Sequence, residues 1–153
     1  MDIINKIFEL DLGKLVPEMG QVLDKARLSV TWAVMIGPIL MLVLGLIYAY
    51  IPPKEANRKF GFRTYFGMGS VKAWRFTQKV AGLAFAALGL IFIIVMLIVI
   101  SRFGKMDHFT MVTTAMVCLI WQLSLALIVR IGVSVLAAVK YDRNGNERKA
   151  KEK

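Results

Sequence analysis

The sequence predicts an all-α integral membrane protein with three transmembrane helices and an N-terminal amphipathic helix. Its 153 residues are 58% hydrophobic, and the apolar residues are gathered into three long blocks. Residues 28–53, 80–101 and 109–129 contain no charged side chain. A helix needs about 20 apolar residues to cross the hydrocarbon layer, so each block is long enough to span it. A soluble domain of this length would instead keep one polar face on each helix.

The chain divides into an N-terminal segment (1–27), a three-span membrane domain (28–140) and a basic C-terminal tail (141–153). Within the membrane domain we expect spans over about 29–51, 80–101 and 109–130. Residues 1–16 carry apolar side chains at helical spacing, which predicts a short helix lying on the membrane surface. Pro17 and Gly20 follow it, and we expect them to end that helix.

Proline and small residues predict where the first two spans bend, begin, end and pack together. Pro38 lies inside span one, where it removes a helix hydrogen bond and predicts a bend that neighbouring helices can tolerate. Pro52 and Pro53 are expected to end that span. Ser70 is a good N-cap for a helix that runs through residues 71–79 into span two. Three small residues of span two form a stripe typical of close helix packing: Gly82, Ala86 and Gly89.

The third apolar pattern extends over residues 109–139 and is interrupted only by Arg130. Two interpretations stay open for this side chain. Arg130 either extends to the cytoplasmic interface, with residues 131–141 continuing beyond the membrane, or it is buried among the helices, where a charge is expensive and usually functional. Gln122 lies inside the same span and is expected to make an interhelical hydrogen bond, with a ligand-lining role as the alternative.

Basic residues in the flanking segments predict the orientation. In a three-span protein, the N-terminal segment and the turn near Gly104 share one side, and together they carry six Lys and Arg residues. The loop 54–79 and the tail share the other side and carry thirteen. Because basic flanks are retained inside, we expect a multi-pass protein of the cell membrane with loop 54–79 and the C-terminus cytoplasmic and the N-terminus external.

The residue types exclude several kinds of chemistry. Cys118 is the only cysteine and His108 the only histidine, so no Cys/His cluster is present for a structural metal. The motifs of zinc peptidases, serine hydrolases and phosphate-binding loops are missing. The three spans contain no acidic residue, whereas proton-coupled pumps normally use one. We therefore expect no enzyme activity, no metal and no cofactor.

The loop 54–79 is basic and rich in aromatic residues. Both ends of this loop are tied to the membrane, so its charge predicts contact with anionic headgroups and not with nucleic acid. Electrostatics alone does not account for the order of its Pro, Asn, Gly, Arg-Thr and Trp residues. The ordered residues are Pro52, Pro53, Lys54, Asn57, Gly61, Phe62, Arg63, Thr64, Trp74, Thr77, Gln78 and Lys79.

That ordered set resembles the signature of the SdpI-like family of small bacterial membrane proteins, several of which are immunity factors against a secreted killing-peptide toxin. The resemblance extends over residues 28–140. Two positions depart from the pattern: Gly67 stands where the family often has Ser, and Gln78 where it often has Asn. The family's best-known members also carry further spans ahead of this unit.

The resemblance implies a non-enzymatic, immunity-type protein that binds a peptide toxin or guards its target. Two alternatives stay open: a scaffold that recruits a cytoplasmic regulator through the loop, and a lipid-binding module. Three spans bury little surface alone, so homo-oligomers are also expected. A cytoplasmic motif cannot be the first part that an external toxin meets, which favours a role in folding or in binding an inner partner.

Individual motif residues suit either binding or folding. Gly61 supplies a backbone conformation closed to other residues, and Asn57 can satisfy loop backbone. Arg63 presents a planar fork of donors for a phosphate or a carboxylate. Trp74 is expected at headgroup level on the first turns of helix two. The candidate site residues are Pro52, Pro53, Asn57, Gly61, Phe62, Arg63, Thr64, Trp74 and Lys79, with Arg130 and Gln122 inside the membrane.

Overall fold

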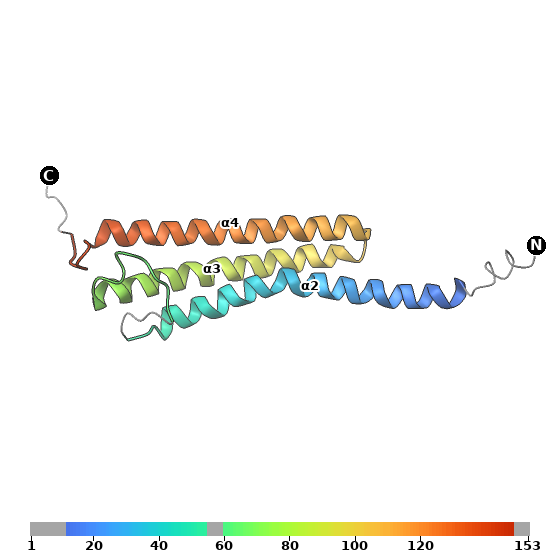
Figure 1. Cartoon of the computed structure of the whole chain (residues 1–153), viewed down its shortest axis with the longest axis horizontal. Helices are drawn as coiled ribbons and strands as arrows, with labels where there is room; N and C mark the ends of the chain where they lie inside the picture. Colours follow the sequence, from blue (N-terminus) through green and yellow to red (C-terminus); the bar gives the residue numbers. More distant parts are fainter. Residues whose placement is uncertain (1–11, 55–59, 149–153) are drawn as a thin grey trace, which may run out of the picture.

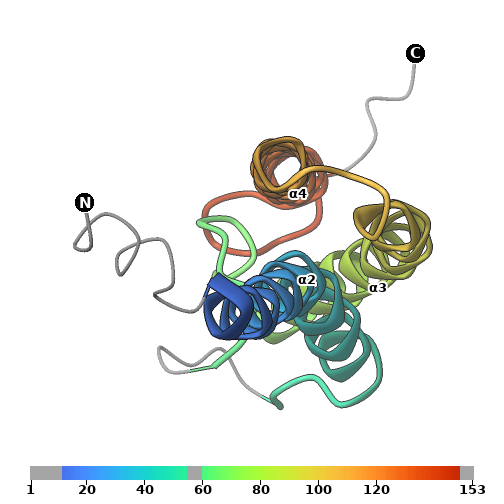
Figure 2. The ribbon, with the colours of Figure 1, turned by 90° about the vertical axis from the view of Figure 1, so that its right-hand side faces the viewer.

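The computed structural model describes residues 12–54 and 60–148. Three long helices make up most of this part: α2 (Leu12–Tyr50), α3 (Val71–Phe103) and α4 (His108–Lys140). The helices α2 and α4 run in one direction and α3 in the other (Figure 1). Seen end-on, the three helices lie at the corners of a triangle (Figure 2). All three are long and apolar enough to cross a membrane, which confirms the predicted all-α, multi-pass architecture.

The N-terminal part differs from the prediction. Residues 1–11, which carry most of the expected surface helix, lie outside the described residues. From Leu12 onward the chain is already part of α2, which continues through Pro17 and Gly20 without a break. The expectation that these two residues end a separate helix was wrong. Pro17 is the sixth residue of α2, so it removes one intrahelical donor, but a single lost bond does not end this long helix.

The predicted helix boundaries around the loop are confirmed. The first span ends at Tyr50, and one residue separates it from Pro52 and Pro53. Ser70 is the N-cap of α3, and its hydroxyl accepts a hydrogen bond from the Ala73 N–H at 3.2 Å. That helix then runs unbroken through the polar residues 71–79 into the apolar block. The loop is therefore tied directly to the end of a long, rigid helix.

The turn between α3 and α4 ends in a second capping residue, Asp107. Its carboxylate accepts hydrogen bonds from the Thr110 N–H at 3.0 Å and the Thr110 hydroxyl at 2.6 Å. These two bonds, the hydroxyl first, hold the pKa of Asp107 below its ordinary value. The turn is at the opposite end of the bundle from the loop and the C-terminal tail (Figure 1).

The predicted small-residue stripe is confirmed as the seam between α2 and α3. A Cβ added to Gly89 would lie 2.5 Å from the Leu42 backbone nitrogen and 2.9 Å from the Pro38 carbonyl oxygen. One added to Gly45, on α2, would collide with the backbone of Ala86. Small residues on both helices therefore let the two backbones touch, as is typical of helix pairs in membranes.

A buried hydrogen bond joins α4 to α2 at Pro38. Proline has no N–H, so the carbonyl of Val34, four residues earlier, loses its helical donor. The side chain of Gln122, only 3% exposed, donates from Nε2 to that carbonyl at 3.0 Å. Gly37 leaves room for the Gln122 side chain, because a Cβ at this position would lie 2.7 Å from Gln122 Oε1. The expected interhelical bond of Gln122 thus replaces the bond that Pro38 removes.

We expect Gln122→Leu to lower the free energy of unfolding by about 1 kcal/mol, because the Val34 carbonyl is left without a donor in an apolar environment. In a Pro38→Ala background the same substitution should have less than half that effect, since the introduced alanine supplies the helical N–H. Unfolding of the four proteins in detergent, arranged as a double-mutant cycle, measures this coupling. Equal effects of Gln122→Leu in both backgrounds would refute it.

Candidate functional site

Two side chains of α3, one helical turn apart, hold both arms of the loop that connects α2 to α3. The indole Nε1 of Trp74 donates to the carbonyl of Pro53 at 2.9 Å. The amide of Gln78 makes a matched pair of bonds with Phe62: its Nε2 donates to the Phe62 carbonyl at 2.7 Å, and its Oε1 accepts from the Phe62 N–H at 2.8 Å. Both side chains are fully buried. The loop is thereby folded back along the first turns of α3.

The residue before Phe62 has to be glycine. Gly61 has a φ of 117°, a region that side chains with a Cβ rarely adopt. A Cβ at this position would also lie 2.6 Å from the Trp74 ring atom Cζ2. Gly61 therefore lets the backbone pass directly over the indole and puts Phe62 in register with Gln78.

A second turn of the loop is organised by two threonines. The Thr64 hydroxyl accepts from the Gly67 N–H at 3.0 Å, and Thr77 donates to the Ala73 carbonyl at 2.8 Å. A Cβ on Gly67 would lie 2.5 Å from each threonine hydroxyl. Gly67 is thus packed closely between Thr64 and Thr77, with no room for a larger residue.

The C-terminal tail packs on this loop, a contact that the sequence analysis missed. The Ser70 hydroxyl donates to the Gly145 carbonyl at 2.8 Å, and Arg143 Nε donates to the Tyr65 hydroxyl at 2.7 Å. A bridge from Tyr141 to Glu147 closes the turn. The docking buries Tyr141 to 2% exposure. Residues 141–148 are therefore folded, and the end of the tail, 149–153, lies outside the described residues.

The signal for this turn was present in the sequence. Asp142 followed by Asn144-Gly145 is a turn pattern, because Asp side chains accept from backbone N–H groups two residues on and glycine supplies positive φ. Asp142 accepts from the backbone N–H groups of Asn146 and Asn144 at 2.8 and 2.9 Å. These bonds, with that of Asn146 first, hold the pKa of Asp142 below its ordinary value.

The structure separates the candidate site residues into three groups. Buried or half-buried residues build the loop: Pro52, Pro53, Gly61, Phe62, Thr64 and Trp74. Arg63 and Lys79 have exposed side chains, and Asn57 lies outside the described residues. Gln122 is bonded to α2, away from the loop. Arg130 is exposed on α4 and lines a cavity with Tyr48 of α2 and Phe85 of α3.

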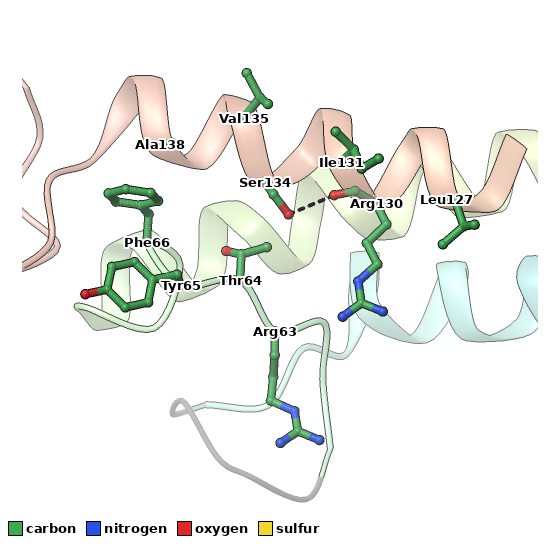
Figure 3. Close-up of a pocket in the computed structure, with 10 residues that line it drawn as sticks. All are labelled: Arg63, Thr64, Tyr65, Phe66, Leu127, Arg130, Ile131, Ser134, Val135 and Ala138. Atoms are coloured by element: carbon green, nitrogen blue, oxygen red, sulfur yellow. Dashed lines mark hydrogen bonds between the residues drawn. The ribbon is translucent and has the colours of Figure 1, made fainter. Parts of the chain in front are cut away.

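Arg63 and Arg130 share a groove between the loop and α4, which reaches Tyr48 of α2 and Phe85 of α3 at its smaller end. The larger of two adjoining cavities has a volume of about 620 Å³ and the smaller about 300 Å³, and both arginines line both of them. In Figure 3 the two guanidinium groups extend in the same direction, away from the α4 ribbon. Residues that line the larger cavity are Arg63, Thr64, Tyr65, Phe66, Leu127, Arg130, Ile131, Ser134, Val135 and Ala138.

The groove is positively charged within the described part of the chain. No Asp or Glu side chain lines either cavity there. The Ser134 hydroxyl donates to the backbone carbonyl of Arg130 at 2.8 Å, and this bond does not involve the Arg130 guanidinium. Two planar guanidinium groups in one groove are suited to binding an anion.

In a comparison with protein families, residues 54–139 match the SdpI/YfhL protein family. The matched stretch begins in the loop and ends one residue before the end of α4. It includes Gly61, Arg63, Trp74, Gln78 and Arg130. Comparisons with curated proteins and with solved structures gave no match.

Proposed function

Because the chain belongs to the SdpI/YfhL protein family, we propose that it is an immunity-type membrane protein that protects the cell from a secreted, membrane-active peptide. It catalyses no reaction; protection comes from binding the peptide or shielding its target. Three helices able to span a membrane support this role, since the protein and the peptide would meet in the bilayer.

One observation supports this proposal at the level of individual residues. The buried residues of the loop motif fold the loop, and Arg63 stays exposed beside Arg130. Trp74, Gln78 and Gly61 hold the loop against α3, so their presence in the motif has a folding explanation. Arg63 makes no contact that folding requires in the described part of the chain. A planar, permanently charged side chain placed outward in this way is suited to a partner.

The orientation of the protein is part of the proposal. The loop and the tail, which carry most of the basic residues, lie at the same end of the bundle (Figure 1). With this end in the cytoplasm, a peptide reaches the groove after it has inserted into the bilayer. Cytoplasmic and external reporter enzymes fused after residue 153 test the orientation, and activity of only the external reporter would refute it.

Deleting the gene in its host tests the protective role. We expect the deletion strain to lose viability in spent medium from competing strains, or with purified membrane-active peptides, at doses that the parent survives. Expression of the protein from a plasmid should restore survival. Unchanged sensitivity of the deletion strain to every medium and peptide would count against the immunity role.

A further inference from the structure

The groove between the loop and α4 has a polar part formed by two cations. Arg63 comes from the loop and Arg130 from α4, and both line the same two cavities. In the described part of the chain, neither guanidinium has an acidic partner in these cavities. Two like charges in one groove repel each other, and the repulsion is relieved when an anion lies between them. The polar part of the groove is therefore suited to a phosphate group.

The rest of the groove is apolar. Four residues of α4 line it at helical spacing, namely Leu127, Ile131, Val135 and Ala138, and Phe66 of the loop faces them. Residues spaced three or four apart lie along one face of a helix. This face forms an apolar strip next to the two cations, about 16 Å long from residue 127 to residue 138. A ligand that fits both parts has an anionic head and a hydrocarbon chain.

The depth of the groove in the membrane agrees with such a ligand. Arg130 lies ten residues before the end of α4, about 15 Å along the helix axis. Gln78, which holds the loop, lies seven residues after the start of α3, about 10 Å from the same end of the bundle. The charge-free block of α3 begins just beyond it, at Val80. The two guanidinium groups are thus close to the boundary between headgroups and hydrocarbon.

We propose that this groove is a specific site for one anionic phospholipid of the leaflet on the loop side. Its phosphate is held between Arg63 and Arg130, and an acyl chain lies along the apolar strip of α4. Anionic lipids attract basic protein segments in the cytoplasmic leaflet in general, but a built site requires these two arginines in particular. The inference stands without the immunity role, because it depends only on the groove.

Native mass spectrometry of the full-length protein tests the proposal, with dioleoyl-phosphatidylglycerol as the probe and dioleoyl-phosphatidylcholine as the neutral comparison. We expect tighter binding of phosphatidylglycerol, weakened about tenfold by either Arg63→Gln or Arg130→Gln, since each removes a charge-assisted hydrogen bond. Arg75→Gln is the matched control: Arg75 is also exposed and lies near the loop, but lines neither cavity. It should change binding less than twofold.

Thermal unfolding with and without phosphatidylglycerol gives a second readout, because a ligand of the folded state raises its stability. The lipid should raise the Tm of the wild type and of Arg75→Gln, and not of the two groove variants. Equal binding of both lipids would overturn the proposal. So would a loss of affinity in Arg75→Gln as large as in the groove variants, because that result indicates diffuse electrostatic attraction. Stabilisation by inorganic phosphate alone, lost in Arg63→Gln, would identify a free anion as the occupant and overturn it too.

Discussion

Gln78→Leu is expected to release the loop from α3 and to lower the free energy of unfolding by about 3 kcal/mol. Leucine fills a similar volume but removes both hydrogen bonds to Phe62. The Phe62 N–H and carbonyl then lose their partners in a partly buried position, at a cost of about 1–3 kcal/mol each. Thermal unfolding in detergent measures the loss, and limited trypsin digestion should show faster cleavage after Arg63.

Lys79→Gln is the matched control for this prediction. Lys79 is the next residue of α3, its side chain is exposed, and substitutions at such positions usually change stability by less than about 0.5 kcal/mol. Its trypsin cleavage after Arg63 should match the wild type. A Gln78→Leu protein as stable and as resistant as Lys79→Gln would show that the amide of Gln78 does not hold the loop.

Gly82→Ala should weaken the packing of α3 on α2 and lower the free energy of unfolding by about 2–3 kcal/mol, the upper part of the range for overpacking of a tight interior. The added Cβ would collide with the Ala49 backbone nitrogen and lie 2.7 Å from the Gly45 carbonyl oxygen. Backbone atoms cannot rotate away as a side chain can, so the helices must separate. Unfolding of the purified protein by increasing SDS gives the change in stability.

Gly132→Ala is the matched control, because it adds the same methyl group at a position where no neighbouring atom is displaced. Nothing lies within 4 Å of a Cβ at Gly132, and alanine favours a helix over glycine by about 1 kcal/mol. This variant should be as stable as the wild type or slightly more stable. If Gly82→Ala behaves like Gly132→Ala, then α2 and α3 are not in direct backbone contact.

The three helices and their caps could be predicted because their causes are local. Charge-free blocks of about 20 residues predict spans, a serine before a helical run predicts an N-cap, and glycines at helical spacing predict a seam. The misreading of Pro17 and Gly20 has a local cause as well. Proline and glycine predict a helix boundary, but α2 continues through both residues.

The contacts that define the site depend on segments far apart in the sequence. Gln122 could be expected to bond to another helix, but its partner, the Val34 carbonyl, is set by the relative height of α2 and α4. Arg130 and Arg63 share a groove only because the loop folds back along α3. Such registers follow from the packing of all three helices, and no single stretch of sequence contains them.

The most direct measurement is survival of the deletion strain carrying variant proteins at equal membrane levels, paired with the stability of each purified variant. If buried motif residues fold the loop and Arg63 acts on the partner, Arg63→Gln should unfold like the wild type and yet fail to protect. Gln78→Leu should lose both stability and protection. Full protection by a stable Arg63→Gln protein would contradict the assignment of Arg63 as the functional residue of the loop.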